Sequence, residues 1–222
     1  MLKCLGDGLS NAESLRGVMN ASLIQLMRAI ASGDGQTASA LLADTPQLAM
    51  TRLERGVPRA TSAEFFLDEL RANVYTGDTA LHVAAFAYDA AFARELVAAG
   101  ADVRATNRRG AEPLHSAANG GPGSPIWNPR RQEAIIAYLI AAGADPNATA
   151  SGRVTPLHRA VRNRCTPAVR ALLAAGADPH RMNDSGSTAF TLTEWNTGRS
   201  GSGSVEAKQE QANIVRLLAA ID

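Results

Sequence analysis

Apolar residues recur along this chain with a long, regular period. Three apolar pairs, Leu96-Val97, Leu139-Ile140 and Leu172-Leu173, each stand two residues before the same triplet, Gly-Ala-Asp. Upstream of each pair, one apolar position recurs at spacings of 33, 43 and 33 residues. Its occupants are Leu81, Leu114, Leu157 and Phe190. A period of this length is typical of a solenoid, in which each unit buries its apolar face against its neighbours.

Start and stop signals predict two helices in each unit. Threonines that can cap a helix precede three of the recurring positions, and prolines suited to a first helical turn precede two of them. These residues are Thr79, Thr155, Thr188, Pro113 and Pro156. The glycine of each Gly-Ala-Asp triplet follows an apolar helix end, where a left-handed capping residue is favoured. Each unit therefore reads as helix, turn, helix and an extended finger that leads to the next unit.

The segments that carry these landmarks resemble the ankyrin repeat. Residues 77–85, 110–118 and 155–160 read GDTALHVAA, GAEPLHSAA and TPLHRA, and they resemble the opening of that repeat. The apolar pairs before Gly-Ala-Asp resemble its close. A fourth copy has Thr191 in place of the histidine and ends on Leu217-Leu218 without the triplet, as a terminal unit would. The resemblance implies an all-α ankyrin-repeat solenoid.

The resemblance also divides the chain, taken as a single domain over 1–222, into units. The four clear repeats are expected at 74–106, 107–149, 150–182 and 183–222. Residues 21–50 keep the repeat spacing but lack the Thr-Pro-Leu-His segment, as expected of a degenerate N-terminal capping repeat. The second and fourth repeats carry long helix–helix loops.

Two segments fall outside the repeat pattern. Residues 51–73 separate the capping repeat from the first clear repeat, and 62–70 predict a short capped helix that covers the N-terminal end of the core. The apolar stripe of this helix comprises Phe65, Phe66, Leu67 and Leu70. Residues 1–20 have no comparable pattern, and we expect them to be mobile.

Composition is that of a soluble intracellular chain. The sequence is 45% hydrophobic but only 5% aromatic, which fits thin helices packed through alanine and leucine. Its two cysteines, Cys4 and Cys165, suggest no disulfide framework, and the first residues lack the apolar run of a secretory signal. No segment has the length of a membrane-spanning helix. We expect a cytoplasmic monomer that does not contact membranes.

The charge is distributed unevenly, although the formal net charge is only +1. Residues 1–103 carry a net −4, 104–181 carry +7 and 182–222 carry −2, and all eleven central cations are arginines. Arginine is suited to a bidentate grip on carboxylate or phosphate. An ordinary solvated face rich in arginine would give the same count.

The resemblance implies where a partner binds. Ankyrin arrays form a concave surface from the fingers around the Gly-x-Thr-Pro segment and from the positions directly after the Ala-Ala of the first helix. The finger positions here are Tyr75, Asp78, Arg108, Arg109 and Arg153, and the helix positions are Phe86, Asn119, Arg162 and Trp195. Aromatic and arginine side chains are the usual interface hot spots. Alternatively, Phe86 and Trp195 pack inward.

The two inserted loops, 119–131 and 196–204, supply a further candidate contact. Trp127 lies between two prolines and precedes two arginines, so we expect it to pack on the stack or on a partner. We hypothesise that both loops meet beside Trp195 and form one edge of the binding surface. Gly/Ser-rich loops can equally be passive spacers.

No residues form a catalytic, metal or cofactor constellation in the sequence. His82, His115 and His158 occupy the Leu-His position, where the resemblance implies a hydrogen-bonding strut between fingers. The aspartates of the Gly-Ala-Asp triplets are better explained by hydrogen bonds to the finger backbone. Cys165 follows two arginines that could activate it, but a small neutral residue in a turn explains it as well.

Two functions remain open at this stage. The favoured one is a non-enzymatic scaffold that binds another protein, expected to be acidic, on the concave face. The alternative is binding of nucleic acid or a small anionic ligand by the central arginines and the Gly-rich loops, with bases stacked on Trp127 or Trp195. Nucleic acid is disfavoured because lysine is nearly absent and the flanking repeats are acidic.

Overall fold

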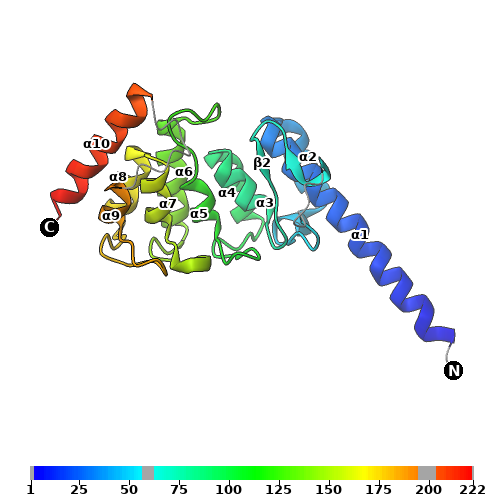
Figure 1. The fold of residues 1–222 in the computed structure, drawn as a ribbon. Helices are drawn as coiled ribbons and strands as arrows, with labels where there is room; N and C mark the ends of the chain where they lie inside the picture. Colours follow the sequence, from blue (N-terminus) through cyan, green and yellow to red (C-terminus); the bar gives the residue numbers. More distant parts are fainter. Residues whose placement is uncertain (1–2, 57–62, 195–203, 222) are drawn as a thin grey trace.

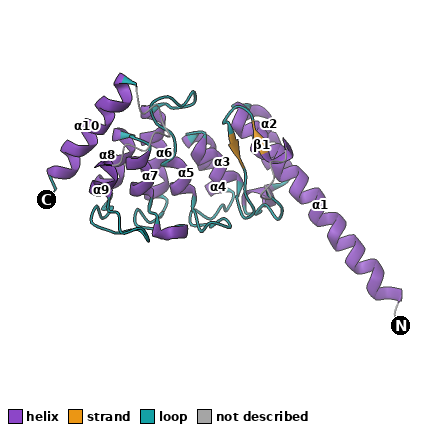
Figure 2. Ribbon diagram, in the orientation of Figure 1, coloured by secondary structure: helices purple, strands orange, loops and turns teal. Residues whose placement is uncertain are grey.

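The computed structural model describes residues 3–56, 63–194 and 204–221. Its helices lie side by side in a row, and the fingers connect them along one edge (Figure 1). The termini lie at opposite ends of the row, and helix dominates the chain, with strand confined to one short hairpin and an isolated bridge among the described residues (Figure 2). The predicted all-α repeat solenoid is confirmed. None of the described helices is both long and apolar enough to cross a membrane.

Each clear repeat contributes a first and a second helix. The pairs are α3 (Ala80–Phe86) and α4 (Ala90–Ala98), α5 (Pro113–Ala117) and α6 (Pro129–Ala141), α7 (Pro156–Arg162) and α8 (Thr166–Ala174), and α9 (Ala189–Glu194) and α10 (Val205–Ala219). A 3₁₀ turn, η3 (Ser151–Arg153), lies in the finger before α7.

The predicted helix signals act as expected. The Thr155 hydroxyl accepts a hydrogen bond from the His158 backbone N–H at the start of α7, and Pro156 is its first residue. At the end of α6, Gly143 has φ +101°, a left-handed conformation that glycine adopts without steric cost. Local capping therefore sets where these helices begin and end.

The N-terminal part is more helical than the sequence predicted. It comprises α1 (Lys3–Ser32), α2 (Gly35–Asp44) and the 3₁₀ turn η1 (Pro46–Ala49). From Leu23 onward α1 buries one face, and α1 packs on α3 while α2 packs on α4. The first half of α1 extends away from the repeats (Figure 1), and residues 15–18 are exposed. Contacts with the rest of the chain begin at Met19, which packs on the core, and Asn20, whose side chain accepts the Glu54 N–H. That half was not predicted as a helix.

The helix predicted at 62–70 is wrong. The structure has a 3₁₀ turn, η2 (Ala63–Phe65), followed by an antiparallel hairpin of β1 (Phe66–Leu67) and β2 (Ala72–Asn73), in which Phe66 pairs with Asn73. Phe65 and Leu67 are buried while Phe66 is half-buried, which is the two-residue alternation of a strand. The hairpin's apolar residues join the core, but α1 and α2 cover the N-terminal end of the stack.

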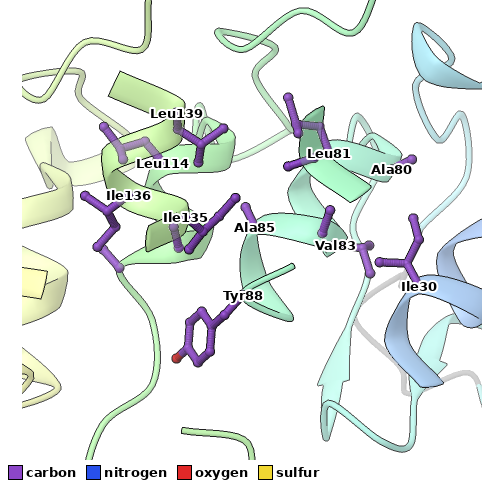
Figure 3. Packing of buried hydrophobic residues seen from close by; sticks show 14 of the residues in the cluster. Ile30, Ala80, Leu81, Val83, Ala85, Tyr88, Leu114, Ile135, Ile136 and Leu139 are labelled. Atoms are coloured by element: carbon purple, nitrogen blue, oxygen red, sulfur yellow. The ribbon is translucent and has the colours of Figure 1, made fainter. Parts of the chain in front are cut away.

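Apolar residues from successive repeats form one continuous core. Figure 3 shows Leu81 from α3, Leu114 from α5 next to Ile135 and Leu139 of α6, and Ile30 of α1 beside Val83. Each of these side chains is at most 3% exposed. Truncation of one such residue costs about 2–5 kcal/mol, so the repeats are held in register mainly by burial.

The insertion in the second repeat is shared between a loop and a longer helix. Helix α6 has 13 residues, whereas α4 and α8 have 9. Its N-cap is Asn128, whose side chain accepts the Arg131 N–H, so Arg130 and Arg131 belong to α6 and not to the predicted loop. The loop proper therefore ends before Pro129.

Candidate functional site

The three histidines of the Leu-His positions link neighbouring fingers. His82 Nε2 lies 2.9 Å from the Ala111 carbonyl, His115 Nε2 lies 3.1 Å from that of Val154, and His158 Nε2 lies 3.0 Å from that of Ser187. Burial lowers the pKa of all three, that of His115 to about 3, so they are neutral at pH 7. The predicted strut role is confirmed.

The other candidate reactive groups are also structural. Asp102, Asp145 and Asp178 accept backbone N–H groups two residues on, as predicted for turn residues. Cys165 is fully buried, donates to Gln132 Oε1, and has its pKa raised to about 11 by burial. Its interpretation as a small neutral turn residue is confirmed. In the described part of the chain, no three His, Cys, Asp or Glu residues converge as metal ligands would.

A hollow of about 510 Å³ crosses the first helices of the repeats. We call it the hairpin groove. The hairpin and its continuation, α3, α5, α7, the fingers and the turns after α5 and α7 contribute its lining residues. These are Leu67, Leu70–Tyr75, Asp78, His82, Val83, Phe86, Asn107, Arg109, Ser116, Asn119, Val154, Arg159, Arg162 and Asn163. Apolar side chains are concentrated at its hairpin end, where Arg71 also lies, and three further arginines, Arg109, Arg159 and Arg162, lie on the second-repeat finger and on α7. The inserted segment 51–73 therefore supplies one wall of the candidate site.

Two finger arginines share one aromatic ring at the mouth of this groove. The guanidinium carbons of Arg108 and Arg109 lie 5.1 and 4.8 Å from the ring centre of Tyr75. Both arginines are exposed, and cation–π contacts of this kind leave the guanidinium N–H groups available to a ligand. The fold thus brings together three of the predicted contact residues.

Asp78 differs from its prediction as an exposed contact residue. It is only 6% exposed, and its carboxylate accepts the Tyr75 N–H at 2.6 Å and the Asn107 side-chain N–H at 2.8 Å. These bonds fix the finger beneath Tyr75. Asp78 therefore lines the hairpin groove as a largely buried residue rather than an exposed one, because a finger carboxylate next to free backbone N–H groups is used internally.

The predicted helix positions have mixed roles. Phe86 is half-buried, packs on the core and still lines the groove, so its inward-packing alternative is partly right. The Asn119 carbonyl accepts the Tyr88 hydroxyl and the Gln132 amide, while the residue also lines the groove. Arg153 is exposed in η3, with φ +53°. Trp195 lies outside the described residues.

Arg159 is the groove residue that the sequence analysis missed. It is half-buried on α7, one turn before Arg162, and donates to the His115 carbonyl at 3.2 Å. Burial, and then the charges of Arg109 and Arg162, lower its pKa to about 10. The three-residue spacing to Arg162, which places both on one helix face, was a usable signal.

Trp127 packs on the stack, which confirms that expectation. Its indole N–H donates to Gln132 Oε1 at 2.9 Å, and its ring contacts the core. Trp127 does not line the hairpin groove. The predicted meeting of its loop with 196–204 falls on residues that, apart from Ser204, are outside the described part.

The comparison with known families agrees with this architecture. A family model described as ankyrin repeats in three copies matches residues 26–150, and one described as ankyrin repeats in many copies matches 139–192. The first covers more than half of the chain, which therefore belongs to the ankyrin-repeat family. A search of curated proteins finds no match. Ankyrin repeats are generally protein–protein interaction modules, and ankyrin-repeat proteins are typically non-enzymatic.

Proposed function

We propose that this chain is a non-enzymatic scaffold that binds an acidic segment of a partner protein in the hairpin groove. The observation that carries the proposal is the cluster of Arg109, Arg159 and Arg162 around one hollow. Among the described residues, none of these arginines has a carboxylate within ion-pair distance. A positive hollow with low-dielectric walls attracts and orients anions more strongly than an exposed patch does.

The groove favours a segment with a particular order of side chains. Leu70, Val74 and Phe86 lie at its hairpin end, whereas the arginine cluster lies toward α7. A matching segment has an apolar or aromatic residue for the first part and aspartate or glutamate for the second. The exposed Arg108 and Arg153 extend the contact along the fingers. Arginine accepts carboxylates in a bidentate geometry, which makes such a contact directional.

A peptide selection tests this function directly. A displayed library of random peptides is selected on the wild-type chain and on a variant with Arg109→Glu and Arg159→Gln. We expect wild-type selections enriched in acidic residues next to an apolar residue, and loss of these peptides with the variant while its circular dichroism is unchanged. Arg170→Gln, an exposed arginine on α8, is the control. Equal binding by the groove variant would contradict the proposal.

The nucleic-acid alternative has less support. Stacking of bases requires an available aromatic face beside the arginines. The Tyr75 ring in the groove already faces Arg108 and Arg109, and Trp127 packs on the core and lies outside the groove. A labelled single-stranded oligonucleotide serves as the counter-probe. Binding that falls steeply between low and physiological salt would favour this alternative.

We also propose that the chain acts as a cytoplasmic monomer. The pair of isolated cysteines in the sequence fits a reducing compartment, and Cys165 is buried. Sedimentation at micromolar concentration tests the monomer: a single species of about 23 kDa is expected from the mass of 23.2 kDa.

A further inference from the structure

The turn between α7 and α8 holds a buried arginine that lacks a partner. Arg164 is only 6% exposed, its φ is +57°, and its Nη1 makes no hydrogen bond. Among the described residues, no carboxylate lies within ion-pair distance of it. A buried charged donor without an acceptor is costly, so its retention calls for an explanation.

Arg164 lines a second hollow, of about 350 Å³, enclosed by α7, α9, α10 and the finger that precedes α9. We call it the Arg164 hollow. The polar residues that line it include Arg162, Arg164, Asn183, Thr193 and Gln211. No Asp or Glu among the described residues lines it. Two arginines and no acidic group of the described residues therefore line the hollow, which makes it positive.

Some of these polar atoms are already engaged, and this narrows what the hollow offers. Asn183 Oδ1 accepts the N–H groups of Ser185 and Ser187, which leaves the Asn183 side-chain NH₂ as a donor. Gln211 donates to the Thr193 carbonyl, and the Thr193 hydroxyl donates to Phe190. The donors that remain include Arg164 Nη1, Asn183, the exposed Arg162 and the hydroxyls of Ser185 and Ser187, a set that favours an anion.

The first repeat shows what the same position does when it is satisfied internally. Tyr88 and Arg164 both stand seven residues after the recurring leucine, and both have φ +57°. Tyr88 is 2% exposed, and its hydroxyl donates to the Asn119 carbonyl of the next repeat. The turn position thus directs a long side chain toward the following repeat. In the third repeat that side chain is a cation whose Nη1 has no acceptor.

We propose that the Arg164 hollow binds a compact anion, a carboxylate or phosphate group, with Arg164 as the internal donor and Arg162 at its mouth. The planar guanidinium offers N–H groups spaced for two oxygens of one such anion. The anion is either a free ion or the side chain of an acidic or phosphorylated residue. This site is distinct from the hairpin groove, although Arg162 lines both.

Calorimetric titration with inorganic phosphate, and separately with succinate, tests the site. Both are compared with sodium chloride at matched ionic strength. We expect saturable, one-to-one binding by the wild type, at least a tenfold loss with Arg164→Met, and a loss of a few fold with Arg162→Gln. The matched control, Arg170→Gln, retains wild-type affinity. Thermal melting in anion-free buffer shows that the Arg164→Met chain is folded.

Three results would overturn the proposal: no saturable binding beyond that of chloride, wild-type affinity in Arg164→Met, or an equal loss in the Arg170→Gln control. Failure here leaves the hairpin groove unaffected, because the groove is tested with Arg109 and Arg159 variants that do not line the Arg164 hollow. The source of the anion follows from competition with a peptide selected on the groove. Displacement of the peptide by phosphate, lost in Arg164→Met, assigns the anion to a side chain of the bound segment. Binding without displacement assigns it to a free ion.

Discussion

The junction between the first and second repeats and the junction between the third and fourth repeats use the same backbone in different ways. At the first junction, the Tyr88 hydroxyl donates a hydrogen bond to the Asn119 carbonyl. The Gln132 side-chain amide donates to that carbonyl and to the Ala117 carbonyl. At the other, Arg164 occupies the position of Tyr88, and its Nη1 has no partner. The histidine strut is present at both junctions. The two junctions therefore differ clearly in their turn residue.

This contrast separates groups that hold the stack together from groups that are available for binding. A buried polar group with partners contributes to stability, whereas one without partners lowers it. Among the described residues, two buried side-chain atoms lack partners, Arg164 Nη1 and Glu112 Oε2. The following experiments measure whether the two junctions differ in stability as their hydrogen bonds imply.

The largest effect is expected at Tyr88. Tyr88→Ala removes a buried aromatic ring and should lower the free energy of unfolding by about 3–5 kcal/mol, measured by urea denaturation. Tyr88→Phe keeps the ring and should cost about 1 kcal/mol, because the Asn119 carbonyl still accepts from Gln132. Equal losses in the two variants would mean that the hydroxyl, not the packing, secures this junction.

Gln132 should have the next largest effect. Its buried amide serves two carbonyls, Trp127 and Cys165, so Gln132→Leu leaves several polar groups unsatisfied. We expect a loss of about 2 kcal/mol in urea denaturation, together with a shift in Trp127 fluorescence. Gln209→Leu on the exposed face of α10 is the control and should change stability by less than about 0.5 kcal/mol. If Gln132→Leu leaves the free energy of unfolding unchanged, the hydrogen bonds of Gln132 do not stabilise this junction, and the two junctions do not differ as proposed.

Glu112 gives a pH-dependent test within the second repeat. It occupies the cap position held by Thr155 in the third repeat, and burial raises its pKa to about 7. The folded state therefore keeps the proton between pH 4.5 and 7 while the unfolded state loses it, so this residue's contribution to stability falls as pH rises through that window. Glu112→Thr should raise the free energy of unfolding by about 1 kcal/mol relative to wild type at pH 8 and change it little at pH 4, as measured by urea denaturation at each pH. A gain independent of pH would contradict this explanation.

The smallest effect on stability is expected at Arg164. Because Arg164 Nη1 has no partner, Arg164→Met should leave the free energy of unfolding within about 0.5 kcal/mol of wild type or raise it. The measurement is the same urea denaturation used for Tyr88. A loss as large as that of Tyr88→Ala would show that Arg164 is a structural residue, and the two junctions would then be equivalent.

Much of the fold could be predicted because its signals are local and repeated. The threonine and proline starts, the glycine stops and the Leu-His positions each act within a few residues, and repetition in three copies makes them unambiguous. The histidine struts were implied by the resemblance to the ankyrin repeat. Segments that occur once were predicted poorly: residues 66–73 form a hairpin, and α1 begins at Lys3. A single cluster of four apolar residues fits either a helix or a strand until its neighbours are known.

The candidate site was predicted in part. The sequence identified Tyr75, Arg108, Arg109 and Arg162 from their repeat positions, and the structure brings them to the groove or its mouth. It could not show that the Asp78 carboxylate accepts a hydrogen bond from the finger backbone, because that depends on which N–H groups the turn leaves free. Nor did it group Arg159 with Arg109, which are 50 residues apart and meet only when repeats stack.

By itself, then, the sequence determined the repeat, most helix limits within the clear repeats and the excess of arginine in the two central repeats, and its resemblance to the ankyrin repeat implied the finger struts. Only the tertiary structure decided which polar side chains have partners: the Tyr88 hydroxyl and Gln132 do, and Arg164 Nη1 does not. The physical reason is the distance along the chain over which each interaction acts. Capping and periodic burial act along the chain, whereas the satisfaction of a buried donor depends on an acceptor in another repeat, and no local pattern specifies that acceptor.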